Sequence, residues 1–260
     1  MKIRAFILLS LFLTLSIGAN ENSIFWELES PEGKQIFIFG SIHVDDNRVV
    51  DFSDSVNNAM KKSDLFVSET NNVNNLKALE GLGGEYNTYL SDEDFQKISE
   101  LSDFHSIETE FAIKLKPWLL GFIFSSPQAM NPFSQDNLLK VAASNYGLAS
   151  KGLETVDEHY SVLDTLSPED QFQILKNVLN LSEADKEKNY ELMIKIYLTF
   201  NLNKILNADE EITKSIVPKK AWSSVKNELI HKRNKLFFNR LLILAKKNVL
   251  FVAVGASHLA

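Results

Sequence analysis

Two short apolar runs, each followed by Gly-x-x-His, lie near opposite ends of the 260-residue chain. The first is IFIFGSIH at 36–43, and the second is LFVAVGASH at 250–258. Short continuous apolar runs are typical of strands that are buried on both faces. Ligands of open α/β sheets bind at the carboxyl ends of parallel strands, so we expect His43 and His258 at one edge of a common sheet.

The residues around the first run predict a compact α/β arrangement. Apolar and aromatic residues flank Pro31-Glu32-Gly33, which indicates a hairpin. Residues 51–63 predict a helix with Ser53 as its N-cap, and 64–70 predict the next strand. A strand–helix–strand unit of this spacing predicts two parallel strands.

Helical patterns dominate the rest of the chain. They fill 71–147 and 156–246, with Ser91, Pro117 and Ser167 marking helix starts, and a short strand is expected at 148–155. The predicted fold is therefore α/β (or α+β), with a central mixed, mostly parallel sheet, a large helical insertion and flanking helices.

The first 19 residues predict a secretory signal peptide. Lys2 and Arg4 precede an apolar run from Ala5 to Ile17, which is shorter than the ~20 residues of a membrane span. An uncleaved N-terminal anchor is the alternative. We therefore expect an exported protein, periplasmic or secreted, with residues 20–260 as one domain and no membrane span after cleavage.

Composition narrows the possible partners and metal sites. The chain has no cysteine, which excludes disulfides and thiolate ligands. Its net charge of −7 disfavours a nucleic-acid partner. A peptide or small-molecule substrate remains, and the sequence does not indicate an oligomeric state.

Two carboxylates follow the other predicted strands. Glu69 ends DLFVSET and Glu154 ends LASKGLET. Two imidazoles and two carboxylates at one sheet edge suit a divalent cation such as zinc, manganese, cobalt or iron. Each residue alone is more typical of a solvated turn, so the prediction of a site depends on all four occurring at matching strand ends.

Arg233 lies on the apolar stripe of a late helix, between Ile230 and Phe237. A charge on an apolar face needs a partner or a site. The alternatives are a snorkelling side chain or a structural ion pair. Asn234 beside it is a weaker candidate, with an exposed helix position as the alternative.

Several of these segments resemble the TraB/PrgY/GumN family, to which the Tiki metalloproteases are related. The resemblance covers roughly 24–260. The segments are IFGSIHV, LKPW, KGLETVDEH, LDTLSPEDQ, HKRN and FVAVGASHL, in that order.

The resemblance implies specific site residues. His43 and His258 are implied as metal ligands, Glu69 and Glu154 as members of the site, and Arg233 with Asn234 as the family's Arg-Asn pair. It also implies a central sheet surrounded by helices. Manganese or cobalt is the implied metal, by similarity to the Tiki proteases.

The chain departs from the family pattern in three places. Ser41 stands where threonine is usual, and His159 stands where glutamine is typical; we expect His159 to pack on its helix rather than to add a ligand. The family continues with a further segment after the second histidine, whereas only Leu259 and Ala260 follow it here. Either the chain is truncated or the domain lacks the usual C-terminal segment; in the second case we expect one edge of the site to be open.

The leading hypothesis is an exported metal-dependent hydrolase of peptide or other amide bonds. His43, His258 and Glu154 would bind the ion, Glu69 would be the base or a further ligand, and Arg233 would stabilise an oxyanion or orient a glutamate. Arg233 and Asn234 are the candidate substrate-binding residues. The alternatives are a non-catalytic protein that sequesters a peptide, haem or metal, and a degenerate, inactive family member.

Overall fold

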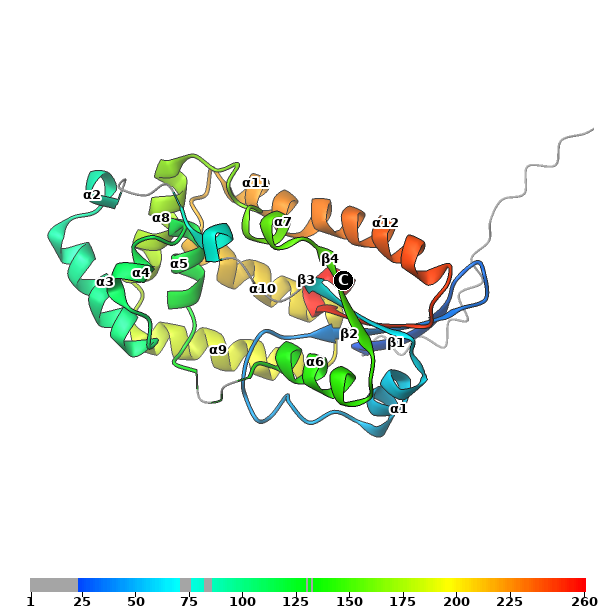
Figure 1. Ribbon diagram of the computed structural model, residues 1–260. Coiled ribbons are helices and arrows are strands. Elements are labelled where there is room, and N and C mark those ends of the chain that lie inside the picture. Colours follow the sequence, from blue (N-terminus) through cyan, green and yellow to red (C-terminus); the bar gives the residue numbers. More distant parts are fainter. Residues whose placement is uncertain (1–22, 71–75, 82–85, 130, 132) are drawn as a thin grey trace, which may run out of the picture.

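A five-stranded sheet forms the centre of the computed structural model, which describes residues 23–70, 76–81, 86–129, 131 and 133–260 (Figure 1). The predicted signal peptide at 1–19 lies outside these residues. The strand order is β1-β2-β5-β3-β4. The strands are β1 (Phe25–Glu29), β2 (Gln35–Ser41), β3 (Leu65–Thr70), β4 (Ala149–Glu154) and β5 (Leu250–Gly255).

The sheet is mixed and mostly parallel, as predicted. β1 and β2 form the expected antiparallel hairpin, whose turn contains Gly33 with a φ of 76°. β5 is parallel to both β2 and β3, and β4 is parallel to β3. β2 and β3 are thus parallel, but they are not neighbours, because the last strand of the chain lies between them.

The helices begin at the capping residues that the sequence indicates. Ser53 accepts from the Val56 backbone, Ser91 forms a capping box with Asp94, and Ser167 accepts from the Asp170 backbone. Before β4 the structure has α1 (Asp54–Lys62), η1 (Leu76–Leu79), α2 (Tyr86–Tyr89), α3 (Asp92–Phe104), α4 (Thr109–Ala112), α5 (Pro117–Phe124) and α6 (Gln135–Asn145). After β4 it has α7 (Val156–Tyr160), α8 (Pro168–Leu179), α9 (Glu183–Tyr197), α10 (Leu202–Ile216), α11 (Trp222–Lys226), the π-helix η2 (Asn227–Lys232), α12 (Arg233–Ala245) and η3 (Ala256–Leu259).

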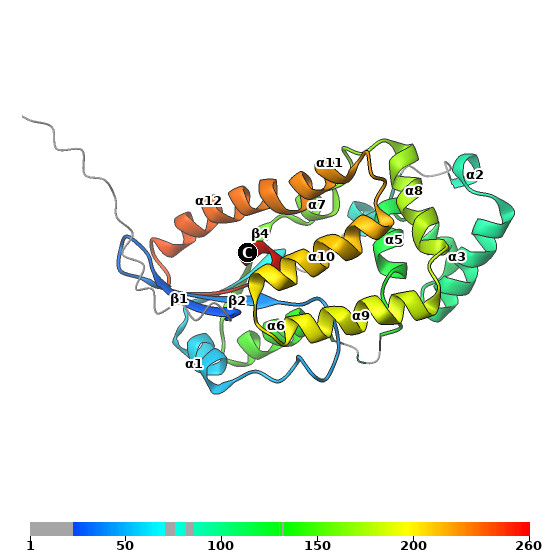
Figure 2. The ribbon, with the colours of Figure 1, turned by 180° about the vertical axis from the view of Figure 1, so that it is seen from behind.

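Helices cover both faces of the sheet. α12 lies on one side, α1 and α6 lie on the other, and α2 to α5 with α8 extend away from the strands (Figures 1 and 2). Side chains alternate along β5: Leu250, Val252 and Val254 pack in the core cluster that includes Phe237 of α12, and Phe251 packs in the cluster that includes α1. Both faces of β5 are therefore buried, which explains why its sequence is apolar without alternation.

The extended helical part has a core of its own. It is built around buried residues of α5 and α8, among them Trp118, Phe124, Phe172 and Leu175. Within the described residues no helix is both long and apolar enough to cross a membrane.

Candidate functional site

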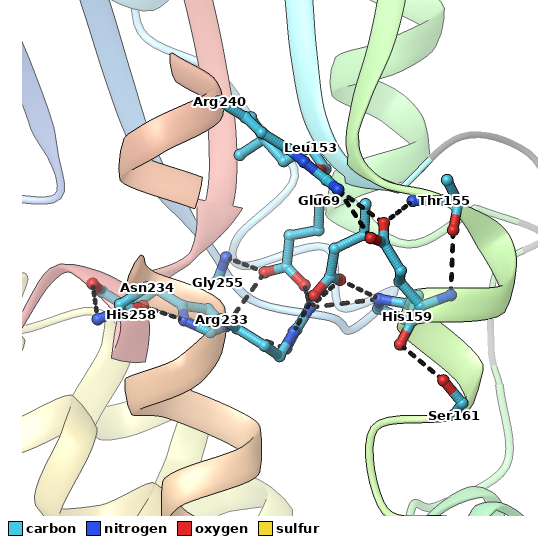
Figure 3. A network of polar contacts seen from close by, with 12 residues as sticks. Glu69, Leu153, Thr155, His159, Ser161, Arg233, Asn234, Arg240, Gly255 and His258 are labelled. Atoms are coloured by element: carbon cyan, nitrogen blue, oxygen red, sulfur yellow. Dashed lines mark hydrogen bonds and ion pairs between the residues drawn. The ribbon is translucent and has the colours of Figure 1, made fainter. Parts of the chain in front are cut away.

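The carboxyl ends of β2, β3, β4 and β5 meet at one edge of the sheet, and the site lies there (Figure 3). Glu69 Oε1 lies 3.9 Å from His43 Nε2 and 3.7 Å from His258 Nε2. Glu69 is buried, and its Oε1 also accepts a 2.7 Å hydrogen bond from the Gly255 backbone. The structure thus brings the two Gly-x-x-His histidines to the same carboxylate.

Arg233 joins the two glutamates. Its Nη2 donates to Glu69 Oε2 at 2.6 Å, and its Nε and Nη2 donate to the two oxygens of Glu154, each at 2.9 Å. The Arg233 side chain is only 11% exposed, and its guanidinium group lies over the ring of Phe237. The charge on the apolar stripe therefore has its partners inside the protein.

A π-helical turn sets the direction of Arg233. η2 separates α11 from α12 and ends immediately before Arg233. A π-turn closes i→i+5 hydrogen bonds and thereby changes the rotation of the residues that follow. Arg233 and Asn234 both face the sheet edge after this turn, as their contacts with Glu69, Glu154 and His258 demonstrate.

Asn234 fixes the orientation of His258. The Asn234 Oδ1 lies 2.6 Å from His258 Nδ1, and its Nδ2 donates to the His258 backbone oxygen at 3.0 Å. Arg233 Nη1 lies 3.2 Å from Nε2 and can only donate, so Nε2 carries the lone pair and Nδ1 the proton. Burial lowers the pKa of His258 to about 4, which keeps this ring neutral at pH 7.

Asp136 orients the ring of His43 in the way that Asn234 orients His258. Its Oδ2 lies 2.7 Å from His43 Nδ1, and its Oδ1 accepts from Ser41 Oγ at 2.5 Å. His43 Nε2 is left facing Glu69, and the ring is 64% exposed, which makes it the open side of the site. Asp136, with a smaller contribution from Glu69, raises the pKa of His43. Any cation bound at Nε2 would have to displace a proton there.

Glu154 accepts from Nε and Nη2 of Arg233, whereas His258 lies at Nη1. Glu154 Oε2 is 3.0 Å from His159 Nδ1, in addition to the contacts with Arg233. His159 also packs edge-on against Tyr160, as expected, but it contacts the Glu154 carboxylate as well, which the sequence did not indicate. Both Glu154 oxygens therefore already have donors.

Both glutamates are stabilised as anions. Burial alone would raise the pKa of Glu69, but Arg233, His43 and His258 outweigh it and lower the pKa. Burial opposes ionisation of Glu154 too, and hydrogen bonds from His159 and Arg233 lower its pKa. A general base works best with a pKa near the working pH, so these carboxylates suit charge-pairing or ligand roles better than proton transfer.

The glycine of each Gly-x-x-His segment allows a close approach. A Cβ on Gly40 would lie 3.1 Å from the Ala256 Cα, where η3 crosses β2. A Cβ on Gly255 would lie 3.3 Å from Glu69 Oε1, 3.5 Å from His43 Nε2 and 3.6 Å from His258 Cδ2. Neither glycine has a positive φ, so close packing rather than a left-handed turn explains both.

The absence of a side chain at Gly255 leaves a space, and the atoms around it decide whether a divalent ion could bind there. Glu69 Oε1, His43 Nε2 and the ring of His258 surround it, and His258 Nε2 lies 3.7 Å from Glu69 Oε1. Both Nδ1 atoms are hydrogen-bonded, as is usual for histidines that bind a metal. The donors therefore suit a divalent ion. Among the described residues, however, no group of three or more His, Asp or Glu side chains is gathered closely enough to hold one, so His43, His258 and Glu69 would have to move closer together around an ion. An ion here would compete with Arg233 Nη1 for His258 Nε2.

The sequence did not indicate two of the residues at the site. Asp136 comes from α6 and Asp209 from α10, both within helical stretches that carry no motif. Asp209 hydrogen-bonds to Ser257, burial raises its pKa, and His43 partly opposes this rise. For Asp136 a weak signal existed, since it is an acidic residue in the first turn of a helix whose N-cap residue is Ser134.

An ion network anchors the loop that carries His43. Asp46 is buried and accepts from Arg48 Nη2 at 2.6 Å, and Arg48 Nη1 donates to Glu191 of α9 at 2.8 Å. Hydrogen bonds from Arg48 lower the pKa of Asp46 to about 2 from the ordinary value of 3.8. The network therefore stabilises the folded state only while Asp46 is ionised.

Replacing Asp46 with asparagine should lower the free energy of unfolding by about 1 kcal/mol at pH 7, because Arg48 is half-exposed and solvent screens the pair. The folded pKa lies below the unfolded one. The stabilisation is therefore complete above about pH 4 and disappears as the pH falls towards 2. Urea unfolding of both proteins across this range measures the difference, and a gap that stays constant down to pH 2 contradicts the assignment.

Comparison with known proteins confirms the family that the sequence segments resemble. A family model described as the TraB/PrgY/gumN family matches residues 24–260, which include every strand and all the site residues named above. No curated protein is similar enough to count as a match. Because the family model spans nearly the whole chain, the chain belongs to the TraB/PrgY/gumN family.

Proposed function

We propose that this protein is an exported, metal-dependent hydrolase of peptide or other amide bonds. The observation that carries the proposal is the meeting of His43 Nε2, His258 Nε2 and Glu69 Oε1 around the space above Gly255. The predicted signal peptide supports export, and similarity to the Tiki proteases suggests manganese or cobalt, with zinc or iron as alternatives.

The geometry favours one division of roles over the one expected from the sequence. His43, His258 and Glu69 are the better ligand set, because both oxygens of Glu154 already accept from Arg233 or His159. A divalent ion held by them would polarise the scissile carbonyl as a Lewis acid.

The protein's own groups then have distinct tasks. Asp136 and Asn234 orient the two imidazoles, and Glu154 holds Arg233 in place. The Arg233 guanidinium supplies a fixed positive charge beside the reacting centre, where it stabilises negative charge that develops on the substrate oxygen. Asn234 uses both ends of its amide on His258, so we propose an orienting role for it rather than substrate binding.

Metal content tests the proposal directly. Protein purified without chelator is expected to contain about one divalent ion per chain, and addition of manganese or cobalt to stripped protein should raise the melting temperature. His43→Ala and His258→Ala should abolish both effects. His231→Ala is the matched control, because this exposed histidine precedes the site helix without reaching the site. If both site variants keep the ion and the melting temperature, no metal is bound here.

Turnover separates an enzyme from a binding protein. A mixture of peptides incubated with manganese- or cobalt-loaded protein should be cleaved, and His258→Ala should abolish the cleavage. Stoichiometric binding of a peptide or haem without any product would contradict hydrolysis.

A second candidate function is non-catalytic binding. Glu69 and Glu154 already neutralise Arg233, so the cation that remains open to a ligand is His43. Its side chain is 64% exposed and its pKa is raised, so a protonated His43 would pair with an anionic group such as a peptide carboxylate or a haem propionate. Binding that survives complete removal of metal by a chelator favours this alternative.

A further inference from the structure

The outer side of α12 carries an unusual set of exposed side chains. Phe238 is 62% exposed, Ile243 is 66% exposed and Leu242 is 38% exposed. Spacings of four and five residues place them together on a helix that packs its other side on the sheet. The set, called here the α12 outer face, is Lys235, Phe238, Asn239, Leu242, Ile243, Lys246 and Lys247.

Single exposed apolar residues are normal on a protein surface, but contiguous ones mark interaction sites. Figures 1 and 2 both place α12 at the boundary of the molecule, with no other element over its outer side. The apolar residues occupy the middle of the helix. Lys235 lies near its start, and Lys246 and Lys247 follow its end.

The charge of this face is opposite to that of the whole chain. The net charge is −7, yet residues 229–260 contain no aspartate or glutamate. Arg233 and Arg240 are paired with Glu69, Glu154 and Glu158. Lys235, Lys246 and Lys247 form no salt bridge with any residue that the structure describes, so their charges face outward.

We propose that the α12 outer face docks on an anionic lipid membrane surface. Apolar side chains flanked by lysines are the pattern of helices that lie in the membrane interface, with the lysine stems extending to the headgroups. A second copy of this chain fits less well, because a two-fold contact of this face would oppose six lysines with no acidic residue. The inference depends on neither metal nor hydrolysis.

Docking in this way would set the position of the candidate site relative to the membrane. Arg233 and Asn234 begin α12 and line the sheet edge, so the site lies at the N-terminal end of the docked helix. Substrates at or near the membrane surface would then reach the exposed side of the site at His43.

In the full chain the predicted signal peptide could bind membranes by itself. A fluorescent probe on the α12 outer face therefore tests whether this face, rather than another part of the chain, contacts the membrane. The chain has no cysteine, so Asn239→Cys accepts one environment-sensitive fluorophore in the middle of the face. Ala184→Cys is the matched control, because Ala184 is exposed and belongs to α9, a helix that lies across the molecule from α12 (Figure 2). Each labelled protein is titrated with vesicles of phosphatidylglycerol and phosphatidylcholine, and with vesicles of phosphatidylcholine alone.

The probe at 239 should brighten with the anionic vesicles only, and the probe at 184 should not respond. In the labelled protein, Phe238→Ser with Leu242→Ser and Ile243→Ser should abolish the response. Lys235→Gln with Lys246→Gln and Lys247→Gln should weaken partitioning roughly 100-fold at low salt.

Three results would overturn the proposal. They are equal responses at the two positions, no response to either vesicle, and a lipid-independent response at 239 that grows with protein concentration or with an added acidic protein. The last would mean that a second copy or a protein partner covers the face.

Discussion

Replacing Arg233 with methionine should lower the free energy of unfolding by about 3–5 kcal/mol at pH 7. Arg233 is the cation shared by Glu69 and Glu154, and all three side chains are nearly buried. Methionine fills a similar volume, so the change removes the charge and the hydrogen bonds and leaves two buried carboxylates without their partner. Chemical denaturation at pH 7 measures the loss.

Arg240→Met is the matched control, since Arg240 lies two turns later on the same helix. It pairs with Glu158, but both side chains are more than a third exposed, so we expect a loss of about 1 kcal/mol or less. Adding Glu69→Gln and Glu154→Gln to Arg233→Met should recover part of the lost stability, because the unpaired charges are gone. A loss equal to that of Arg240→Met, or no recovery in the triple variant, would show that Arg233 does not neutralise buried charge.

Replacing Glu69 with glutamine should weaken manganese binding more than about 100-fold, whereas Glu154→Gln should weaken it less than about tenfold. Glu69 Oε1 is the carboxylate oxygen near both histidine Nε2 atoms, at 3.9 and 3.7 Å. Glutamine keeps the size of the side chain but removes the negative charge. Loss of a residue that only orients a ligand typically costs 10–100-fold, and loss of a ligand should exceed this.

The two substitutions should affect manganese binding differently, because different groups already contact the two carboxylates. Arg233 and His159 donate to both oxygens of Glu154, and Glu154 makes no hydrogen bond to His43 or His258. Calorimetric titration of chelator-treated protein with manganese chloride measures both variants. Glu158→Gln serves as control, because this carboxylate pairs with Arg240 outside the site. A larger loss with Glu154→Gln than with Glu69→Gln would make Glu154 the ligand instead.

Much of the fold could be predicted because its signals are local. Pro31 and Gly33 indicate the hairpin turn, and serine side chains at 53, 91 and 167 satisfy backbone groups of the helices they begin. Such signals depend on neighbours in the sequence. The place of β5 between β2 and β3 depends on packing between segments that lie far apart along the chain, and no local pattern encodes it.

Some residues of the candidate site could likewise be predicted from the sequence, and others could not. His43, Glu69, Glu154 and His258 follow strands, and parallel strands bring their carboxyl ends to one edge, so their convergence could be expected. Asp136 reaches His43 from α6, and Asp209 reaches Ser257 from α10. The helices α6 and α10 deliver these residues, and the position of the two helices relative to the sheet depends on the packing of the whole core.

The sequence by itself determined that two matched histidines and two glutamates would lie at the ends of strands in a mostly parallel sheet. It also determined that an arginine on the apolar stripe of a helix would need a partner or a site. Periodicity and capping depend on the order of residues that are close together in the sequence, so they can be recognised without the tertiary structure. Only the tertiary structure decided which group faces which. Arg233 could have reached solvent, but a π-turn and the burial of Phe237 direct it between Glu69 and Glu154. That placement leaves Glu69, rather than Glu154, beside the two histidines.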